Sequence, residues 1–329
     1  MTSEPATTEL APLPERLVER LREIFTEAVA ETVIQRFTSP PRQALRINTL
    51  KADWDATVRQ LRDDGINAVR IPGFGRAFTI PEAQQQQVAA HPLVKTCAVY
   101  LHPPSHMLGP LALKVRPGHQ VLDLAPTQGG EILQLATLMK NSGRLAVAEP
   151  IRVRYLKIND LFERAGVTIG RCDMTDSCSV GTKTPDRYDR VLLDAPCSGE
   201  ARFDRRNRRT WKYWSRDTIA ENASRQKSLL TSAITATRPG GACVYTTSTF
   251  APEENEAVLQ YVLDRFGDDI FLDNIDLPEA ITARQVPALT QWRTQAFDES
   301  IANARRILPD DTYDGLFIAR LRKRNWEGL

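Results

Sequence analysis

From about residue 106 onward, the sequence repeats one unit: an apolar strand, a turn and an amphipathic helix. Four of these strands read "HQVLDLA", "GRLAVAEP", "YDRVLLDAPCSG" and "GGACVYTTSTF", and a helical pattern follows each of them. Strands that alternate with helices form mostly parallel sheets with helices on both faces, so the expected fold class is α/β. Ligands of such sheets bind beyond the carboxyl ends of the strands, which directs attention to the residues that follow each strand.

The N-terminal third of the chain has a different pattern. Its first 38 residues predict one amphipathic helix, with Leu17, Leu21 and Ile24 on one side, and "SPP" ends it. A strand at "ALRINTL", a helix at "DWDATVRQLRDDG" and short extended pieces then predict a small α+β unit. We therefore expect two domains: residues 1–105, with the N-terminal helix and the α+β unit, and residues 106–329, with the α/β sheet.

Composition narrows the class of protein. With 329 residues and 42% hydrophobic content, the chain is long and apolar enough for a globular core. The N-terminus carries acidic residues before any apolar run, so we expect a cytoplasmic protein with no membrane contact. Five cysteines without a CxxC pair, and four histidines without zinc-like spacing, predict free thiols and no metal. A net charge of +2 means that any nucleic-acid affinity must come from a local patch.

Acidic residues stand at the ends of four successive predicted strands: Asp123, Glu149, Asp173 and Asp194. Glu149 has the spacing at which an acidic residue accepts hydrogen bonds from a ribose in nucleotide-binding α/β folds. A solvated charge at the start of a helix is the alternative for this residue. Together, the four acids predict an adenosyl cofactor that is held by its hydroxyl and amine groups.

The turn after the first strand, "APTQGGEI", is the expected cofactor turn. Its candidate cofactor-binding residues are Ala125, Gln128, Gly129, Gly130 and Glu131. Glycines at this point let the backbone approach a ligand and let the helix pack on the strand. The full GxGxxG pattern is absent, so an ordinary tight turn is the alternative.

The most specific segment is "VLLDAPCSGE". Together with "QKSLL", "RPGGACVYTTS" and "PEENEAV", it resembles the Sun/NSUN family of RNA 5-methylcytosine methyltransferases, which use S-adenosylmethionine. "PPRQALRINTL", "YLHPPSHML" and "DGLFIARLRK" extend the resemblance over most of the chain, and the bacterial branch of the family looks most similar. The resemblance implies a Rossmann-like class I methyltransferase domain with a mostly parallel seven-stranded sheet, a small N-terminal α+β domain, rRNA or tRNA as partner, and a monomeric protein.

The chemistry of that family depends on a thiol. A cysteine thiolate adds to cytosine C6, which makes C5 nucleophilic enough to accept the methyl group, and a base then removes the C5 proton. The resemblance implies that Asp194 holds the N3/N4 edge of the base. The family carries its nucleophile in a Thr-Cys after the fifth strand, and a second cysteine, implicated in product release, in a Pro-Cys after the fourth. Here the Pro-Cys cysteine is Cys197, and Ser248 occupies the position of the nucleophile.

This departure leaves two hypotheses open, because a serine gives almost no alkoxide near neutral pH. In the first, Cys197 is the nucleophile, and Cys197, Asp194 and Ser248 are the catalytic residues of an RNA (cytosine-C5) methyltransferase acting on rRNA or tRNA. In the second, the chain is an inactive homologue that acts as an RNA-binding or ribosome-assembly factor. A small buried side chain is the bland alternative for Cys197, and a hydroxyl bonded to the backbone is the alternative for Ser248.

The cofactor turn departs from the family as well. The family turn reads Ala-Ala-Pro-Gly-Gly-Lys, whereas this chain has Gln128 at the proline and Glu131 at the lysine. A charge pair at ~4 Å is worth up to ~4 kcal/mol at an effective dielectric constant near 20. If position 131 lies near the methionine carboxylate, Glu131 would therefore weaken the binding of S-adenosylmethionine.

The segment "ARFDRRNRRTWKYW" follows the Pro-Cys turn and predicts an RNA contact. Guanidinium groups pair with phosphates, and aromatic rings stack on unpaired bases. A solvated basic loop with its tryptophans packed under the domain is the alternative. The predicted RNA-binding residues are Arg42, Arg46, Arg202, Arg205, Arg206, Arg208, Arg209, Trp211 and Lys212.

Overall fold

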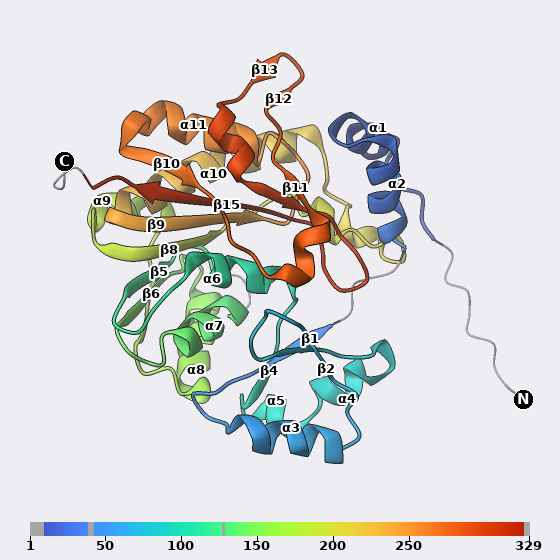
Figure 1. Ribbon diagram of the computed structural model, residues 1–329, viewed down its shortest axis with the longest axis vertical. Helices are drawn as coiled ribbons and strands as arrows, with labels where there is room; N and C mark the ends of the chain where they lie inside the picture. The colour runs from blue at the N-terminus through green and yellow to red at the C-terminus, as the bar shows by residue number, and fades with distance from the viewer. Residues whose placement is uncertain (1–9, 39–42, 127–128, 326–329) are drawn as a thin grey trace, which may run out of the picture.

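The computed structural model describes residues 10–38, 43–126 and 129–325. Two sheets organise the chain, a large one built mainly after residue 106 and a small one before it (Figure 1). The Rossmann-like α/β fold with a small N-terminal α+β domain is therefore confirmed. Among the described residues, no helix combines the length and the apolarity that a membrane crossing needs.

The large sheet has the strand order β11-β14-β15-β9-β8-β5-β6-β7, and β10 pairs with β15. The bounds are β5 (Gln120–Asp123), β6 (Arg144–Ala148), β7 (Gly170–Asp173), β8 (Tyr188–Asp194), β9 (Thr237–Thr247), β10 (Ile270–Asp273), β11 (Gln285–Pro287), β14 (Arg305–Ile307) and β15 (Leu316–Lys323). Strands β5 to β9 pair in parallel, and the others pair antiparallel. The predicted count of seven strands was too low: the described sheet has nine, because short strands form in the segment before β15.

Helices cover both faces of this sheet. They are α6 (Leu108–Leu113), α7 (Gly130–Leu138), α8 (Arg152–Ala165), α9 (Val180–Lys183), α10 (Arg216–Ala236) and α11 (Glu256–Phe266). Side chains alternate across each strand, so Leu192 packs with Val121 and Val244 on one face, whereas Leu193 packs with Tyr245 on the other. The first turn of α10 is capped by Ser215, whose hydroxyl accepts the N–H of Thr218 at 3.0 Å.

The small sheet is antiparallel, with the order β2-β3-β1-β4. Its strands are β1 (Ala44–Ile47), β2 (Val69–Arg70), β3 (Ala77–Thr79) and β4 (Val99–Leu101), and its helices are α3 (Trp54–Asp63), α4 (Gln85–Ala89) and α5 (Pro92–Lys95). A separate apolar cluster that includes Leu45, Ile47 and Leu61 forms its core. Outside both sheets, β12 (Gln291–Trp292) and β13 (Gln295–Ala296) form a separate two-stranded hairpin.

The N-terminal segment differs from its prediction. It forms two helices, α1 (Glu15–Ile24) and α2 (Glu27–Arg36), because the backbone of Phe25 is extended and interrupts the helix. Both helices pack on the large domain, where Leu17 and Leu21 join the apolar cluster that contains Phe250. In Figure 1 they lie beside the upper part of the molecule, away from α3. The helix predicted to belong to the small domain therefore supports the large one.

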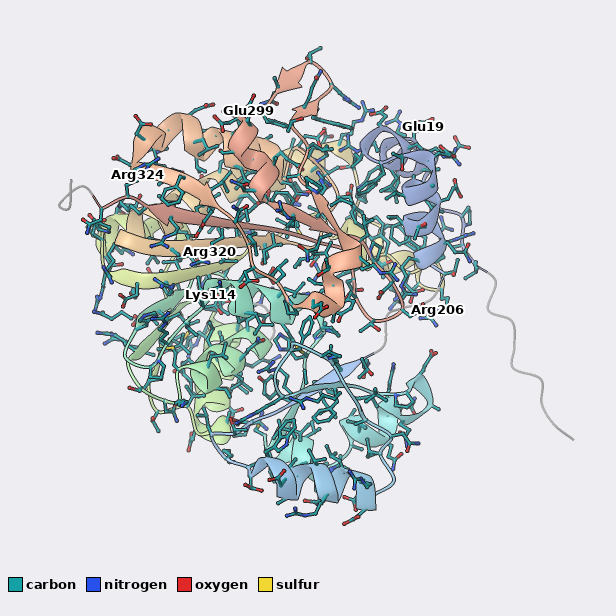
Figure 2. All side chains as sticks on the ribbon, in the orientation of Figure 1. Glu19, Lys114, Arg206, Glu299, Arg320 and Arg324 are labelled. Atoms are coloured by element: carbon teal, nitrogen blue, oxygen red, sulfur yellow. The ribbon has the colours of Figure 1, made fainter. Side chains whose placement is uncertain are left out.

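A buried ion pair fixes the start of α11. Glu256 accepts two hydrogen bonds from Arg306, at 2.8 and 2.6 Å, and neither side chain is more than 3% exposed. Removing one partner of such a pair leaves a buried charge uncompensated. We expect Glu256→Gln to lower the free energy of unfolding by about 3–5 kcal/mol in urea titrations. Glu19→Gln on the solvent side of α1 (Figure 2) is the control and should change it by less than about 0.5 kcal/mol. Equal effects of the two changes would contradict this account of the pair.

Candidate active site

A cavity of about 430 Å³ opens beyond the carboxyl ends of β5, β6 and β8. Its volume lies within the range that small-molecule ligands require. Ala125, Glu149 and Cys197 line it, together with the arginines described below. The three strands end together because Asp123 is paired with Val147 of β6 and Leu192 of β8. The cavity thus lies at the position where the α/β pattern predicts a ligand.

Two of the predicted cofactor acids have different surroundings. Glu149 is buried in the cavity wall, and its Oε1 accepts the N–H of Ile151 at 2.7 Å, which leaves Oε2 toward the space and 4.0 Å from Arg154. Asp173 is exposed, is not among the residues that line the cavity, and accepts a hydrogen bond from Arg171 at 2.9 Å. Glu149 therefore presents a carboxylate at the cavity wall, whereas the backbone carbonyl of Asp173 accepts the N–H of Glu149 at 3.1 Å and supports its position.

The cofactor turn is shaped by its glycines. Gly129 has a φ of +84°, which favours glycine. A Cβ atom on Gly130 would lie 2.6 Å from the ring of His102, so only glycine lets this ring pack against the start of α7. Asp123 is buried beneath the turn, and burial raises its pKa well above the usual value. Gln128 lies outside the described residues.

Glu131 does not face the cavity. It is 4% exposed, its Oε1 accepts a hydrogen bond from His106 Nδ1 at 2.8 Å, and His102 Nε2 lies 3.7 Å away. Burial opposes its ionisation, but the hydrogen bond from His106 and the nearby ring of His102 hold the pKa of Glu131 below its ordinary value. The structure therefore does not support repulsion of the cofactor carboxylate by Glu131, because the Glu131 carboxylate is hydrogen-bonded to His106 inside the protein.

Asp194 lies at the end of β8, next to the hydrogen-bonded pair of His106 and Glu131. Its Oδ1 accepts the hydroxyl of Thr246 at 2.8 Å, and its Oδ2 lies 3.6 Å from His106 Nδ1. His102 and His106 were not among the predicted site residues. The signal was present in "YLHPPSHML", where two histidines stand four residues apart in the segment before α6 and β5.

Cys197 is the cysteine that reaches the cavity. Burial raises the pKa of its thiol to about 12, although the guanidinium of Arg202 and the backbone N–H of Ser248 act in the opposite direction. Ser248 itself is 4% exposed and does not line the cavity. Within the described part of the chain, no histidine is hydrogen-bonded to the Ser248 hydroxyl, so the structure offers it no general base.

The "PEENE" motif holds the two turns that carry Cys197 and Ser248. Glu253 pairs with Arg20 of α1 at 2.7 Å. Glu254 accepts the N–H of Ser198, next to Cys197, at 2.9 Å. Asn255 accepts the hydroxyl of Thr247 at 2.6 Å and donates to the carbonyl of Thr249 at 3.0 Å. These acids and this amide are structural supports of the site, which the sequence alone did not reveal.

Arginines surround the mouth of the cavity. Arg154, Arg202 and Arg225 line it, all three are exposed, and Glu149 is the acid among the lining residues. This positive rim suits an anionic ligand group such as a carboxylate or a phosphate. Of these three residues, only Arg202 was predicted as a site residue.

The basic segment after the Pro-Cys turn is partly structural. Trp211 is 7% exposed and packs in the core, and it also lines a surface hollow with Arg208, Arg209 and Lys212, so its contact with RNA stays a prediction. Arg205 donates to the carbonyl of Ala11, and Arg206, at the edge of the molecule in Figure 2, donates to Asp204 at 2.9 Å. The exposed cations of this segment without a hydrogen bond or ion pair among the described residues are Arg202, Arg208, Arg209 and Lys212.

Arg46, one of the two predicted arginines of the N-terminal unit, does not form part of this surface. Arg46 is 3% exposed and donates to Tyr100 Oη and to the carbonyl of Phe74, both at 3.1 Å. The expectation that Arg46 binds RNA is therefore wrong, because its guanidinium is used inside the domain. Arg42 lies outside the described residues.

The Rossmann-like sheet and the cavity at its strand ends define a methyltransferase domain. The chain belongs to the 16S rRNA methyltransferase RsmB/F family, which matches residues 110–322 of the sequence. The RsmF/B-like ferredoxin-like domain matches residues 13–87. Methyltransferases of this family use S-adenosylmethionine. The predicted relation to RNA 5-methylcytosine methyltransferases is confirmed.

Individual relatives agree with this assignment. The chain is 31% identical over 317 residues to ribosomal RNA small subunit methyltransferase F of Vibrio vulnificus, covering 94% of this chain and 64% of the relative. It is 32% identical to the protein of the same name from Aeromonas salmonicida, covering 87% of this chain and 58% of the relative. The chain thus spans less than two thirds of the length of these curated relatives. A methyltransferase homologue from Pyrococcus horikoshii has a solved structure with 28% identity and a TM-score of 0.76, covering 94% of this chain and all of that one.

Proposed function

We propose that this protein is an S-adenosylmethionine-dependent rRNA cytosine-C5 methyltransferase that uses Cys197 as its nucleophile. The observation that carries the proposal is the position of Cys197 on the wall of the strand-end cavity, on the turn that begins at Asp194. Ser248 is covered, lacks a hydrogen-bonded histidine within the described residues, and so offers no comparable route to a nucleophile.

The roles of the neighbouring groups follow from this choice. The thiolate of Cys197 adds to C6 of the target cytosine, C5 takes the methyl group from the sulfonium, a base removes the C5 proton, and the thiolate leaves. Asp194 orients the N3/N4 edge of the base, and Glu149 binds the ribose of the cofactor. The arginines at the mouth, Arg202 and Arg225, attract the carboxylate of the cofactor or a phosphate of the RNA.

Calorimetric titration tests the cofactor step. We expect S-adenosylmethionine to bind the unmodified protein with one site, and Glu149→Ala to weaken that binding at least about tenfold through the loss of the ribose contact. The control is Asp173→Ala, which is expected to change the affinity less than about threefold because Asp173 is exposed and paired with Arg171. Absence of binding to the unmodified protein would contradict the enzymatic proposal.

The partly buried thiol of Cys197 gives the reaction a defined pH dependence. Because the pKa of Cys197 is raised to about 12, the thiolate is a small fraction at pH 7 and grows tenfold with each pH unit. Methyl transfer at saturating substrates should therefore rise about tenfold between pH 7 and pH 8. Initial rates with tritiated S-adenosylmethionine measure this slope, and a flat profile over that range would contradict a rate that depends on the Cys197 thiolate.

A second candidate function is RNA binding without methyl transfer. The serine at position 248 and the raised pKa of Cys197 favour it, since both reduce nucleophilicity. The exposed Arg208, Arg209 and Lys212 would then serve an RNA-binding or ribosome-assembly role. The two candidates separate in one comparison: an inactive RNA-binding protein retains its RNA affinity and shows no methyl transfer at any pH at which it is folded.

A further inference from the structure

Three side chains from three elements meet behind the cavity. His106 comes from the short helix Ser105–Met107, Glu131 from the first turn of α7 and Asp194 from the end of β8, and their polar atoms lie within 4.8 Å of one another. His106 Nδ1 is 2.8 Å from Glu131 Oε1 and 3.6 Å from Asp194 Oδ2. His106 therefore faces two carboxylates at once.

The surroundings of His106 decide which group carries the charge. Glu131 and Asp194 face it directly, Asp314 adds a further nearby carboxyl, and Arg202 and His102 are the nearby basic groups. Burial opposes the imidazolium, but Glu131 and Asp194 outweigh it and raise the pKa of His106 to about 9. Burial instead lowers the pKa of His102, which leaves that ring neutral. Of the two histidines, His106 is the cation at pH 7.

Hydrogen bonds hold this arrangement in place. Asp194 is fixed on one side by the Thr246 hydroxyl at 2.8 Å and faces His106 on the other. The Nδ1 atom of His106 is engaged by Glu131, whereas its Nε2 atom has no hydrogen-bond partner among the described residues. The ring is 9% exposed, so the cation is screened little by water.

We propose that His106, held by Glu131, is a positioning residue that supplies the fixed positive charge behind Asp194 and so keeps the Asp194 carboxyl aligned toward the target base. The inference rests on the proposed function for its catalytic consequence. Addition of a thiolate at C6 drives electrons toward the N3 side of the ring, and a cation close to the group that holds that edge stabilises the adduct. Glu131 acts through His106 and does not touch the substrate.

The first experiment measures the charge itself. The ring Cε1–H resonances of the four histidines are followed by NMR from pH 5 to pH 10 in the unmodified protein and in Glu131→Gln. We expect His106 to titrate near 9 in the unmodified protein and to move at least one pH unit lower in Glu131→Gln, because the amide keeps a hydrogen bond but not the charge. His119, which precedes the amino end of β5, is the internal control and should titrate identically in both proteins.

The second experiment measures the consequence for the reaction. His106→Gln should lower kcat for methyl transfer at least tenfold while leaving the affinity for S-adenosylmethionine within twofold, since His106 does not line the cavity. In the unmodified protein the rise of the rate with pH should end near pH 9, where His106 loses its proton, and this break should be absent in His106→Gln.

These readouts separate the two proposals. If the protein transfers no methyl group, the proposed function fails, and the NMR titration still decides whether the charged pair exists. The inference is overturned if His106 titrates at its ordinary value near 6.5, if Glu131→Gln leaves its titration unchanged, or if elemental analysis finds a divalent cation at one equivalent that abolishes the titration.

Discussion

Replacing the thiol of Cys197 is expected to abolish methyl transfer. In Cys197→Ala the rate should fall at least about 10³-fold, which corresponds to about 4 kcal/mol of lost transition-state stabilisation. The reason is that C5 of cytosine stays a poor nucleophile unless C6 carries an adduct, and no other cysteine lines the cavity within the described residues. Initial rates with tritiated S-adenosylmethionine and 16S rRNA measure the effect.

Two variants control this result. Cys178→Ala removes another partly buried thiol that does not line the cavity and should keep the rate within about twofold. Ser248→Ala removes the hydroxyl at the position of the family nucleophile and should lower the rate less than about tenfold. A loss in Ser248→Ala as large as that in Cys197→Ala, or full activity of Cys197→Ala, would contradict the assignment of Cys197.

The second large expected effect is a loss of folding stability in Glu131→Lys. Glu131→Lys restores the lysine of the family turn, yet it places an ammonium group beside the His106 imidazolium in a buried site. We expect this change to lower the free energy of unfolding by about 3–5 kcal/mol, the range found when one partner of a buried pair is lost. Urea unfolding followed by tryptophan fluorescence measures the loss.

A double variant that also lacks His106 identifies the cause of that loss. In Glu131→Lys/His106→Ala the opposing cation is absent, so at least half of the lost stability should return. Glu163→Lys, on the exposed face of α8, is the surface control for the same charge reversal and should cost less than about 1 kcal/mol. Additive losses in the double variant would show that repulsion by His106 is not the reason.

The sheet could be predicted because its signal is local. Each parallel strand is a short apolar run followed by a turn, and Asp123, Glu149 and Asp194 mark strand ends that the register then aligns. The strands β11 and β14, at one end of the sheet, were missed because each has three residues and is stabilised by pairing with neighbours that are distant in sequence. The break between α1 and α2 was missed for a related reason: the apolar periodicity continues across Phe25, and packing on the large domain decides the geometry.

The candidate site was predicted where residue type and strand end coincide. Cys197 and Glu149 satisfy both conditions and line the cavity. Arg46 was assigned to RNA on residue type alone, and burial assigns it to the interior. The partnership of Glu131 with His106 could not be predicted, because it joins two segments 25 residues apart whose contact depends on the packing of His102 against Gly130.

The central claim is that Cys197 forms a covalent bond to the target base. 16S rRNA transcribed with 5-fluorocytosine tests it, because fluorine at C5 cannot leave as a proton and the methylated adduct stays attached to the enzyme. With S-adenosylmethionine present, the account predicts a covalent protein–RNA complex, resistant to denaturation, whose digest carries the adduct on Cys197. A complex attached through Ser248, or no complex under conditions in which the protein binds both the cofactor and the RNA, would contradict it.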